Sequence, residues 1–167
     1  MKTARVIVII ILLIIGGLAI ANGQINVNIG FDPKIAILGT DNQFTKHDPL
    51  FNFEIKIEIY DDERHYFALG YKYVNLSSYY RSYYINIGKE LEVARNVLFI
   101  PNLELGLLVR DMQTQKAVAG VIYPQINTDI RYDFKRFQIS LKPYVQYSRD
   151  IGKAFRYGSN ISLIIKI

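Results

Sequence analysis

The sequence predicts an all-β protein: an eight-stranded antiparallel up-and-down transmembrane β-barrel preceded by a helical signal peptide. Three observations lead to this fold class. The chain of 167 residues begins with a short basic and then aliphatic segment. Most of the remaining chain alternates apolar with polar residues, and short polar connections separate the alternating segments. Alternation with a period of two is typical of strands whose two faces meet different environments.

Residues 1–21 have the parts of a secretory signal peptide. A basic start and an unbroken aliphatic run over 6–15 precede Ala19-Ile20-Ala21, where small residues suit signal peptidase. We expect cleavage after Ala21, or as late as after Gly23, so that 22–167 form the barrel domain. The alternative is an uncleaved membrane anchor. It is disfavoured because an apolar stretch of about 15 residues is shorter than the roughly 20 that cross a bilayer.

The clearest alternation lies in residues 51–60. Odd positions carry phenylalanine or isoleucine, and even positions carry asparagine, glutamate, lysine, glutamate and tyrosine. A helix with this sequence would have charges on every face, so a strand is predicted. Seven further segments fit the same pattern, which gives eight strands and an up-and-down meander. They are 25–37, 64–73, 82–90, 99–110, 118–134, 136–148 and 156–167.

Four prolines leave the strand boundaries open. Pro33, Pro101, Pro124 and Pro143 all fall inside predicted strands, where each removes one backbone hydrogen-bond donor. Bulges could accommodate them, and the ambiguous stretch 118–123 could hold one.

The two faces of the predicted strands differ sharply. One face is almost wholly aliphatic and aromatic, whereas the other carries acids and bases at i, i+2 spacing. In a soluble barrel, such as a lipocalin-like ligand-binding barrel, the apolar face would fill the interior, and in a membrane barrel it faces outward. Mixed charges can neutralise one another in a narrow interior. We therefore predict a structural interior charge network of Glu54, Lys56, Glu58, Lys72, Glu104, Asp129, Arg131 and Lys142.

Aromatic residues of the apolar face gather near the strand ends, which favours the membrane arrangement. Two aromatic girdles that flank an aliphatic band are typical of membrane barrels, and a soluble core has no reason to sort its aromatic residues in this way. With a periplasmic N-terminus, the extracellular girdle would contain Phe51, Phe53, Tyr71, Tyr73, Tyr83, Tyr147 and Tyr157. The periplasmic girdle would contain Phe67, Phe99, Tyr132, Phe134 and Phe137.

Composition excludes several classes of protein. There is no cysteine and there are two histidines, so neither a disulfide framework nor a multi-histidine metal site is expected, and no cofactor is predicted. The formal charge of +5 falls by two without Lys2 and Arg5 of the leader. That charge is too small and too scattered to indicate a nucleic-acid partner.

A leader, eight alternating strands, short turns and a last strand that runs to the C-terminus resemble the small OmpA/OmpX-type outer-membrane β-barrel family. The resemblance covers essentially all of 22–167 and rests on pattern, without a diagnostic motif. It implies the bacterial outer membrane of a Gram-negative envelope and the barrel-assembly machinery as a partner during biogenesis. Such proteins often end in phenylalanine, whereas this chain ends in Ile167. Recognition by an assembly machinery with a different preference for the C-terminal residue is therefore implied.

Eight strands enclose an interior about wide enough for side chains alone, so we expect a plugged polar interior without a wide pore. The function expected is a non-enzymatic structural or surface-interaction role. The alternative is an outer-membrane lipid A-modifying enzyme that transfers or removes acyl chains, because barrels that resemble this one use serine and histidine near the outer rim. His47-Asp48 and Ser77-Ser78 would be the candidates in the extracellular loops.

The loops also suggest partners. Their basic residues slightly outnumber their acidic ones, which would attract lipopolysaccharide phosphates as well as outer-membrane lipids. Tyr79-Tyr80 and Phe155 could extend such a surface or contact a protein partner. The basic loop residues are Lys46, Arg81, Lys116, Arg149 and Lys153.

Overall fold

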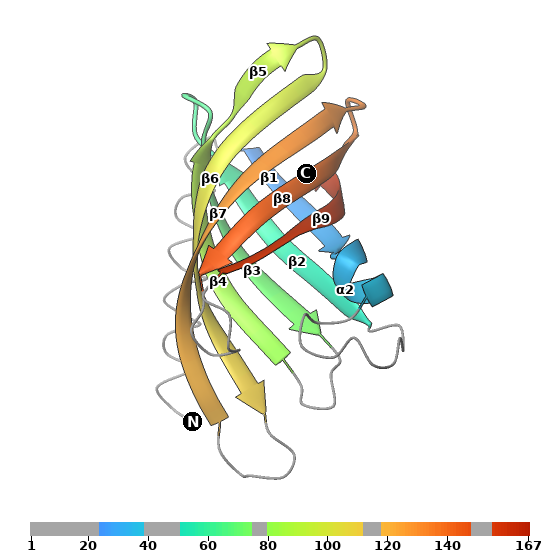
Figure 1. Ribbon diagram of the computed structural model, residues 1–167. Coiled ribbons are helices and arrows are strands. Elements are labelled where there is room, and N and C mark those ends of the chain that lie inside the picture. Colours follow the sequence, from blue (N-terminus) through green and yellow to red (C-terminus); the bar gives the residue numbers. More distant parts are fainter. Residues whose placement is uncertain (1–23, 39–50, 75–79, 112–117, 148–154) are drawn as a thin grey trace.

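The computed structural model describes residues 24–38, 51–74, 80–111, 118–147 and 155–167. These ranges are almost entirely antiparallel strand (Figure 1). None of the helices in these ranges is long and apolar enough to cross a membrane. The elements are β1 (Gln24–Phe31), α2 (Pro33–Leu38), β2 (Asn52–Tyr60), β3 (His65–Val74), β4 (Tyr80–Lys89), β5 (Leu91–Ala94), β6 (Val97–Asp111), β7 (Val118–Asp133), β8 (Phe137–Tyr147) and β9 (Phe155–Lys166).

Eight strands, β1 to β4 and β6 to β9, close into a barrel. Each pairs with its sequence neighbour in an antiparallel ladder, β1 also pairs with β9, and β4 pairs with β6. β5 pairs with the start of β6, and this hairpin extends past one rim of the barrel (Figure 1). The predicted fold class, an eight-stranded antiparallel up-and-down barrel, is confirmed.

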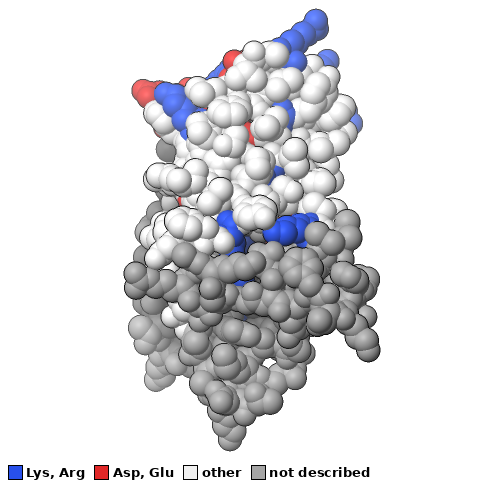
Figure 2. Space-filling model, in the orientation of Figure 1, with Lys and Arg blue, Asp and Glu red and all other residues white. Residues whose placement is uncertain are grey.

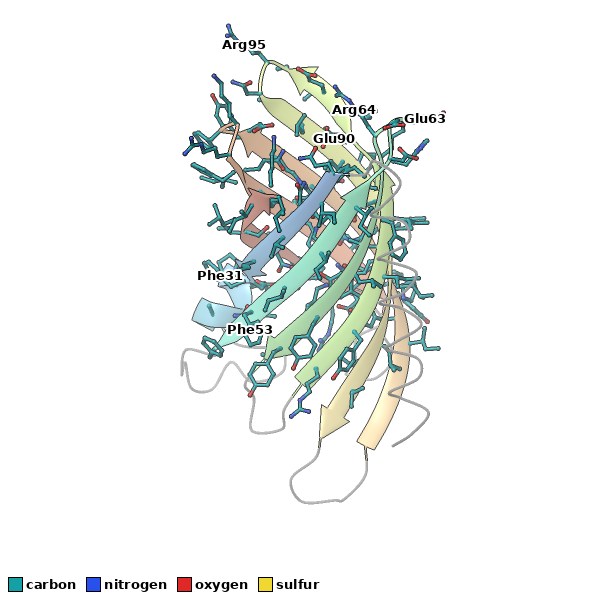
Figure 3. The ribbon with its side chains drawn as sticks, turned by 180° about the vertical axis from the view of Figure 1, so that it is seen from behind. Phe31, Phe53, Glu63, Arg64, Glu90 and Arg95 are labelled. Carbon is teal, nitrogen blue, oxygen red and sulfur yellow. The ribbon has the colours of Figure 1, made fainter. Side chains whose placement is uncertain are left out.

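The two ends of the barrel differ. Three tight turns, at residues 61–64, 95–96 and 134–136, lie at what we call the turn end, and each contains a non-glycine residue with positive φ. Gln24 and Ile167 also lie at this end, since the backbone N–H of Ile167 bonds to Ile25. We call the opposite end, from which the connections 39–50, 75–79, 112–117 and 148–154 leave the strands, the loop end. Figure 3 shows Glu63, Arg64, Glu90 and Arg95 at the turn end, with Phe31 and Phe53 toward the other.

The barrel is polar inside and apolar outside. Buried side chains are mainly asparagine, glutamine, serine and charged residues, whereas isoleucine and leucine side chains of the wall are exposed. On β7, for example, Gln125 is 2% exposed and the adjacent Ile126 is 65% exposed. Figure 2 shows that charged side chains gather at the turn end, above a largely uncharged band. A soluble lipocalin-like barrel would have the reverse arrangement, so that alternative is wrong.

The first strand is shorter than expected. β1 ends at Phe31, and residues 33–38 form α2, so the strand predicted to continue to residue 37 is wrong there. Asp32 caps the helix, because its Oδ1 accepts the backbone N–H groups of Lys34 (2.8 Å) and Ile35 (3.2 Å). Pro33 takes the first helical position, where no N–H is needed.

The other three prolines occupy places where a ladder stops or lapses. Pro101 lies opposite the break between β4 and β5, and Pro124 lies one residue beyond the last β7–β8 pair. At Pro143 the β7–β8 pairing lapses and then resumes in the same register. The missing N–H is tolerated at such points. No bulge is needed, since β6 and β7 keep one register from Val97 to Asp111, and the bulge considered for 118–123 is absent from this ladder.

Candidate functional site: the charged barrel interior

The barrel interior holds the densest set of polar groups in the described ranges. Seven of the eight charged residues expected there are buried, and the Lys72 side chain is 17% exposed. They come from five strands: β2, β3, β6, β7 and β8. Four are acids and four are bases, so the set is neutral. The residues are Glu54, Lys56, Glu58, Lys72, Glu104, Asp129, Arg131 and Lys142.

Four of these eight charged residues, Arg131 among them, form one group, which we call the Arg131 cluster. The guanidinium donates two parallel hydrogen bonds of 2.8 Å to Glu58 and one of 2.6 Å to Asp129. Lys56 Nζ lies 2.7 Å from Glu58 and 3.5 Å from Asp129. Bidentate, charge-assisted bonds of this kind are among the strongest in proteins. Tyr60 completes the cluster, because its hydroxyl donates to Glu58 and accepts from Arg131.

The other four charges form the Glu54 cluster. Lys142 Nζ donates to Glu54 at 2.6 Å, and the Tyr84 hydroxyl and the Asn160 amide donate to the same carboxylate. Lys72 Nζ lies 2.5 Å from Glu104 and 3.9 Å from Glu54, so it joins the two acids. Glu104 also accepts bonds from Tyr123, Gln125 and Asn127.

The two clusters place paired charge in the barrel interior. Each acid has a base within ion-pair distance and further hydrogen-bond donors, which is what a buried charge requires. No group of three or more His, Cys, Asp or Glu residues that could hold a metal occurs in the ranges described. The arrangement suits a fixed polar plug.

Inward-facing tyrosines are the part of the interior that the sequence did not reveal. Tyr84 lies directly across from Gly70, Tyr123 from Gly106 and Tyr144 from Gly158. Each ring occupies the space above its glycine, since a Cβ atom at Gly70 would overlap the Tyr84 ring. Glycine–tyrosine pairs across neighbouring strands could have predicted these positions, but such pairs can be recognised only once the register between the strands is known.

Gly70→Ala is expected to lower the free energy of unfolding by about 1–3 kcal/mol. The added methyl group must displace the Tyr84 ring, whose hydroxyl bonds to Glu54. Urea unfolding in lipid vesicles measures the change. Gly120→Ala is the matched control, because its Cβ would lie at an ordinary 3.5 Å from Leu107 and should have little effect. Equal losses in both variants would contradict the role assigned to the tyrosine.

The outward aromatic residues form two groups of touching rings. Toward the loop end, Phe53 lies 5.8 Å from Phe51 and 5.9 Å from Tyr71, and Tyr71 lies 5.3 Å from Tyr83. Tyr73, Tyr147 and Tyr157 lie toward the same end. Toward the turn end, Phe134 contacts Tyr132 and Phe137, and Phe67 on β3 and Phe99 on β6 also point outward. Their role at membrane interfaces stays a prediction.

The candidate residues for catalysis lie outside the described ranges. These are His47-Asp48 and Ser77-Ser78, and Lys46, Lys116, Arg149 and Lys153 of the expected basic loop set also lie outside them. The lipid A-modifying alternative therefore stays a prediction.

Comparison with known proteins identifies the fold. No protein-family model and no curated protein matches the sequence. The N-terminal β-barrel domain of Pseudomonas aeruginosa OprF superposes with a TM-score of 0.66 at 9% identity, over 86% of this chain and 97% of that one. The chain has the outer-membrane β-barrel fold.

Two further solved structures support the same barrel. The Yersinia pestis outer membrane protein Ail, in a phospholipid bilayer nanodisc, gives a TM-score of 0.58 at 9% identity over 87% of this chain and all of that one. Neisserial surface protein A gives 0.51 at 13% identity, over 87% and 96%. These are small outer-membrane barrels of the OmpA/OmpX type. At such identities the likeness concerns the fold alone.

Proposed function

We propose that this protein is a non-enzymatic integral outer-membrane barrel with a structural or surface-interaction role and a plugged polar interior. The observation that carries the proposal is the charge-balanced interior inside an apolar wall. Closure into a barrel satisfies the backbone of every strand in lipid, which is the physical reason for this architecture in a membrane. In this proposal the turn end faces the periplasm, and residues 1–21 are the signal peptide that directs export.

The loop end would meet the partners. Arg81 is exposed on the outer wall at this end, opposite Tyr73, and Lys34 Nζ lies 4.4 Å from the ring centre of Tyr157. Cations beside aromatic rings suit the phosphate groups of lipopolysaccharide at a membrane surface. Phe155, which is 64% exposed, would add to a surface for a protein partner. The barrel-assembly machinery would be the partner during insertion.

The membrane location can be tested by fractionation and gel mobility. We expect the protein in the outer-membrane fraction and expect unheated samples to migrate differently from boiled ones, because a closed barrel resists detergent until heated. A soluble protein with no mobility shift would refute the proposal.

The plugged interior predicts an absence of conductance. Purified protein in a planar bilayer should give current no higher than background, because ion-paired side chains fill the space that eight strands enclose. A general porin in the same bilayer shows that the measurement detects a pore. Stable unitary currents from this protein would contradict the plug.

A further inference from the structure

A groove of about 850 Å³ crosses the outer wall near the turn end. We call it the wall groove. One side is apolar and is built by neighbours in register on four strands: Phe67, Ile87, Leu103 and Ile126. Three of these side chains, Ile87, Leu103 and Ile126, are more than half exposed. A volume of this size is typical of small-molecule sites, which are mostly apolar with a few polar groups.

The wall groove leads from the rim into the apolar band. Its lining runs from residues 59–61 at the end of β2, past His65 at the start of β3, to Thr128, five residues before the end of β7 at Asp133. Three strand spacings separate β3 from β7 across β4 and β6, a distance of about 14 Å. The groove therefore has one end at the rim, where a lipid headgroup would lie, and one end in the apolar band, where an acyl chain would lie.

The rim end carries charges of both signs. Lys89 Nζ lies 3.4 Å from His65 Nε2, and within the described residues Lys89 forms no ion pair. His65 Nδ1 lies 3.0 Å from Asp61 Oδ2 and 3.8 Å from Glu63. Desolvation raises the pKa of the Asp61 carboxyl, but hydrogen bonds from His65 outweigh it and hold that pKa below its ordinary value. The Lys89 ammonium and the Asp61 and Glu63 carboxylates thus lie at opposite nitrogens of the His65 ring.

We propose that the wall groove binds a phospholipid whose headgroup carries both a phosphate and a primary ammonium, with an acyl chain along Phe67, Ile87, Leu103 and Ile126. Lys89 contacts the phosphate, and Asp61 with Glu63 accepts hydrogen bonds from the ammonium. A purely anionic headgroup would face these two carboxylates, and a quaternary ammonium has no hydrogen to donate. The inference rests on the proposed membrane location, and it names the class of lipid that the wall groove binds there.

Lipid retention tests the site. The full chain is inserted into vesicles of equal parts phosphatidylethanolamine, phosphatidylglycerol and phosphatidylcholine, extracted in mild detergent, and analysed for bound lipid by native mass spectrometry. We expect phosphatidylethanolamine to be enriched by about threefold to tenfold over the other two. Bound lipid in the bulk proportions, or enrichment of either other lipid, would overturn the assignment.

Variants distinguish the contribution of the headgroup contacts to lipid binding from that of the acyl-chain contacts. Lys89→Gln should remove most of the enrichment, and Asp61→Asn, which keeps the turn's hydrogen-bond acceptor, should shift the preference toward phosphatidylglycerol. Thr128→Phe should reduce all bound lipid by filling the groove. Arg95→Gln, on the β5–β6 hairpin and not lining the groove, is the control and should change nothing. Unchanged binding in Lys89→Gln would refute the site.

Failure of the site and failure of the membrane proposal give different results. A protein that does not insert into vesicles refutes the membrane location and the lipid site with it. A protein that inserts, shows the heat-dependent gel shift and retains lipid in bulk proportions refutes the site alone.

Discussion

Replacing Arg131 with methionine is expected to lower the free energy of unfolding by about 3–5 kcal/mol. The Arg131 side chain is fully buried, and it supplies the bidentate bond to Glu58 and the bond to Asp129. Without it, Glu58 and Asp129 keep Lys56 as the one cation within ion-pair distance among the residues that the structure describes. Urea titration of the barrel in lipid vesicles, followed by gel mobility, measures the loss.

A second ion pair provides the control for this prediction. Lys166 Nζ lies 2.5 Å from Asp133, but both side chains are more than a fifth exposed at the turn end. Lys166→Met should therefore cost no more than about 1 kcal/mol. Adding Asp129→Asn to Arg131→Met should restore part of the stability, because the uncompensated charge is removed and the ion pair between Lys56 and Glu58 remains. Equal losses in Arg131→Met and Lys166→Met would contradict the buried cluster.

The strands and their faces could be predicted because they depend on a local pattern. In residues 51–60 every second side chain is apolar, and a strand places those side chains on one side whatever its partners are. The structure accordingly buries the side chains of Glu54, Lys56 and Glu58, all on β2, in the barrel interior. The same reasoning applies to β8 and β9, whose alternation is equally regular.

The partners of each charge could not be predicted, because they depend on register. Lys142 meets Glu54, 88 positions away in the chain, and Arg131 meets Glu58, 73 positions away. A shift of one residue between two strands would turn every side chain of one strand to the other face. Alternation predicts which residues are inside, whereas the closed set of ladders determines which of them touch.

Two elements were missed where local signals competed. Residues 32–38 continue the apolar alternation of β1, but the Asp32-Pro33 pair supplies a helix cap and a first helical residue, and α2 forms instead. Residues 91–98 lie between the predicted strands 82–90 and 99–110, so no strand was predicted there. The structure extends the hairpin through Ala94, beyond the ladder break that faces Pro101.

Leu141→Arg is expected to lower the free energy of unfolding in lipid by about 2–4 kcal/mol. Leu141 points outward near the middle of β8, between Phe137 at the first residue and Tyr147 at the last, and it is 46% exposed in the isolated barrel. If the aromatic rings mark the two membrane interfaces, this position lies near the bilayer midplane, where a guanidinium loses most of its hydration. Unfolding in vesicles of uncharged lipid measures the cost.

Val93→Arg separates burial in lipid from any general effect of adding a charge. Val93 is 61% exposed on the β5–β6 hairpin, beyond the rim of the barrel, so its substitution should cost less than about 1 kcal/mol. Both positions are exposed apolar residues on strands, and they differ in whether lipid or water is expected to cover them. A large loss at Leu141 with a small one at Val93 is expected only if the apolar wall lies in a membrane. A small loss of unfolding free energy in both variants would mean that water covers the wall. That result would refute the proposed outer-membrane location.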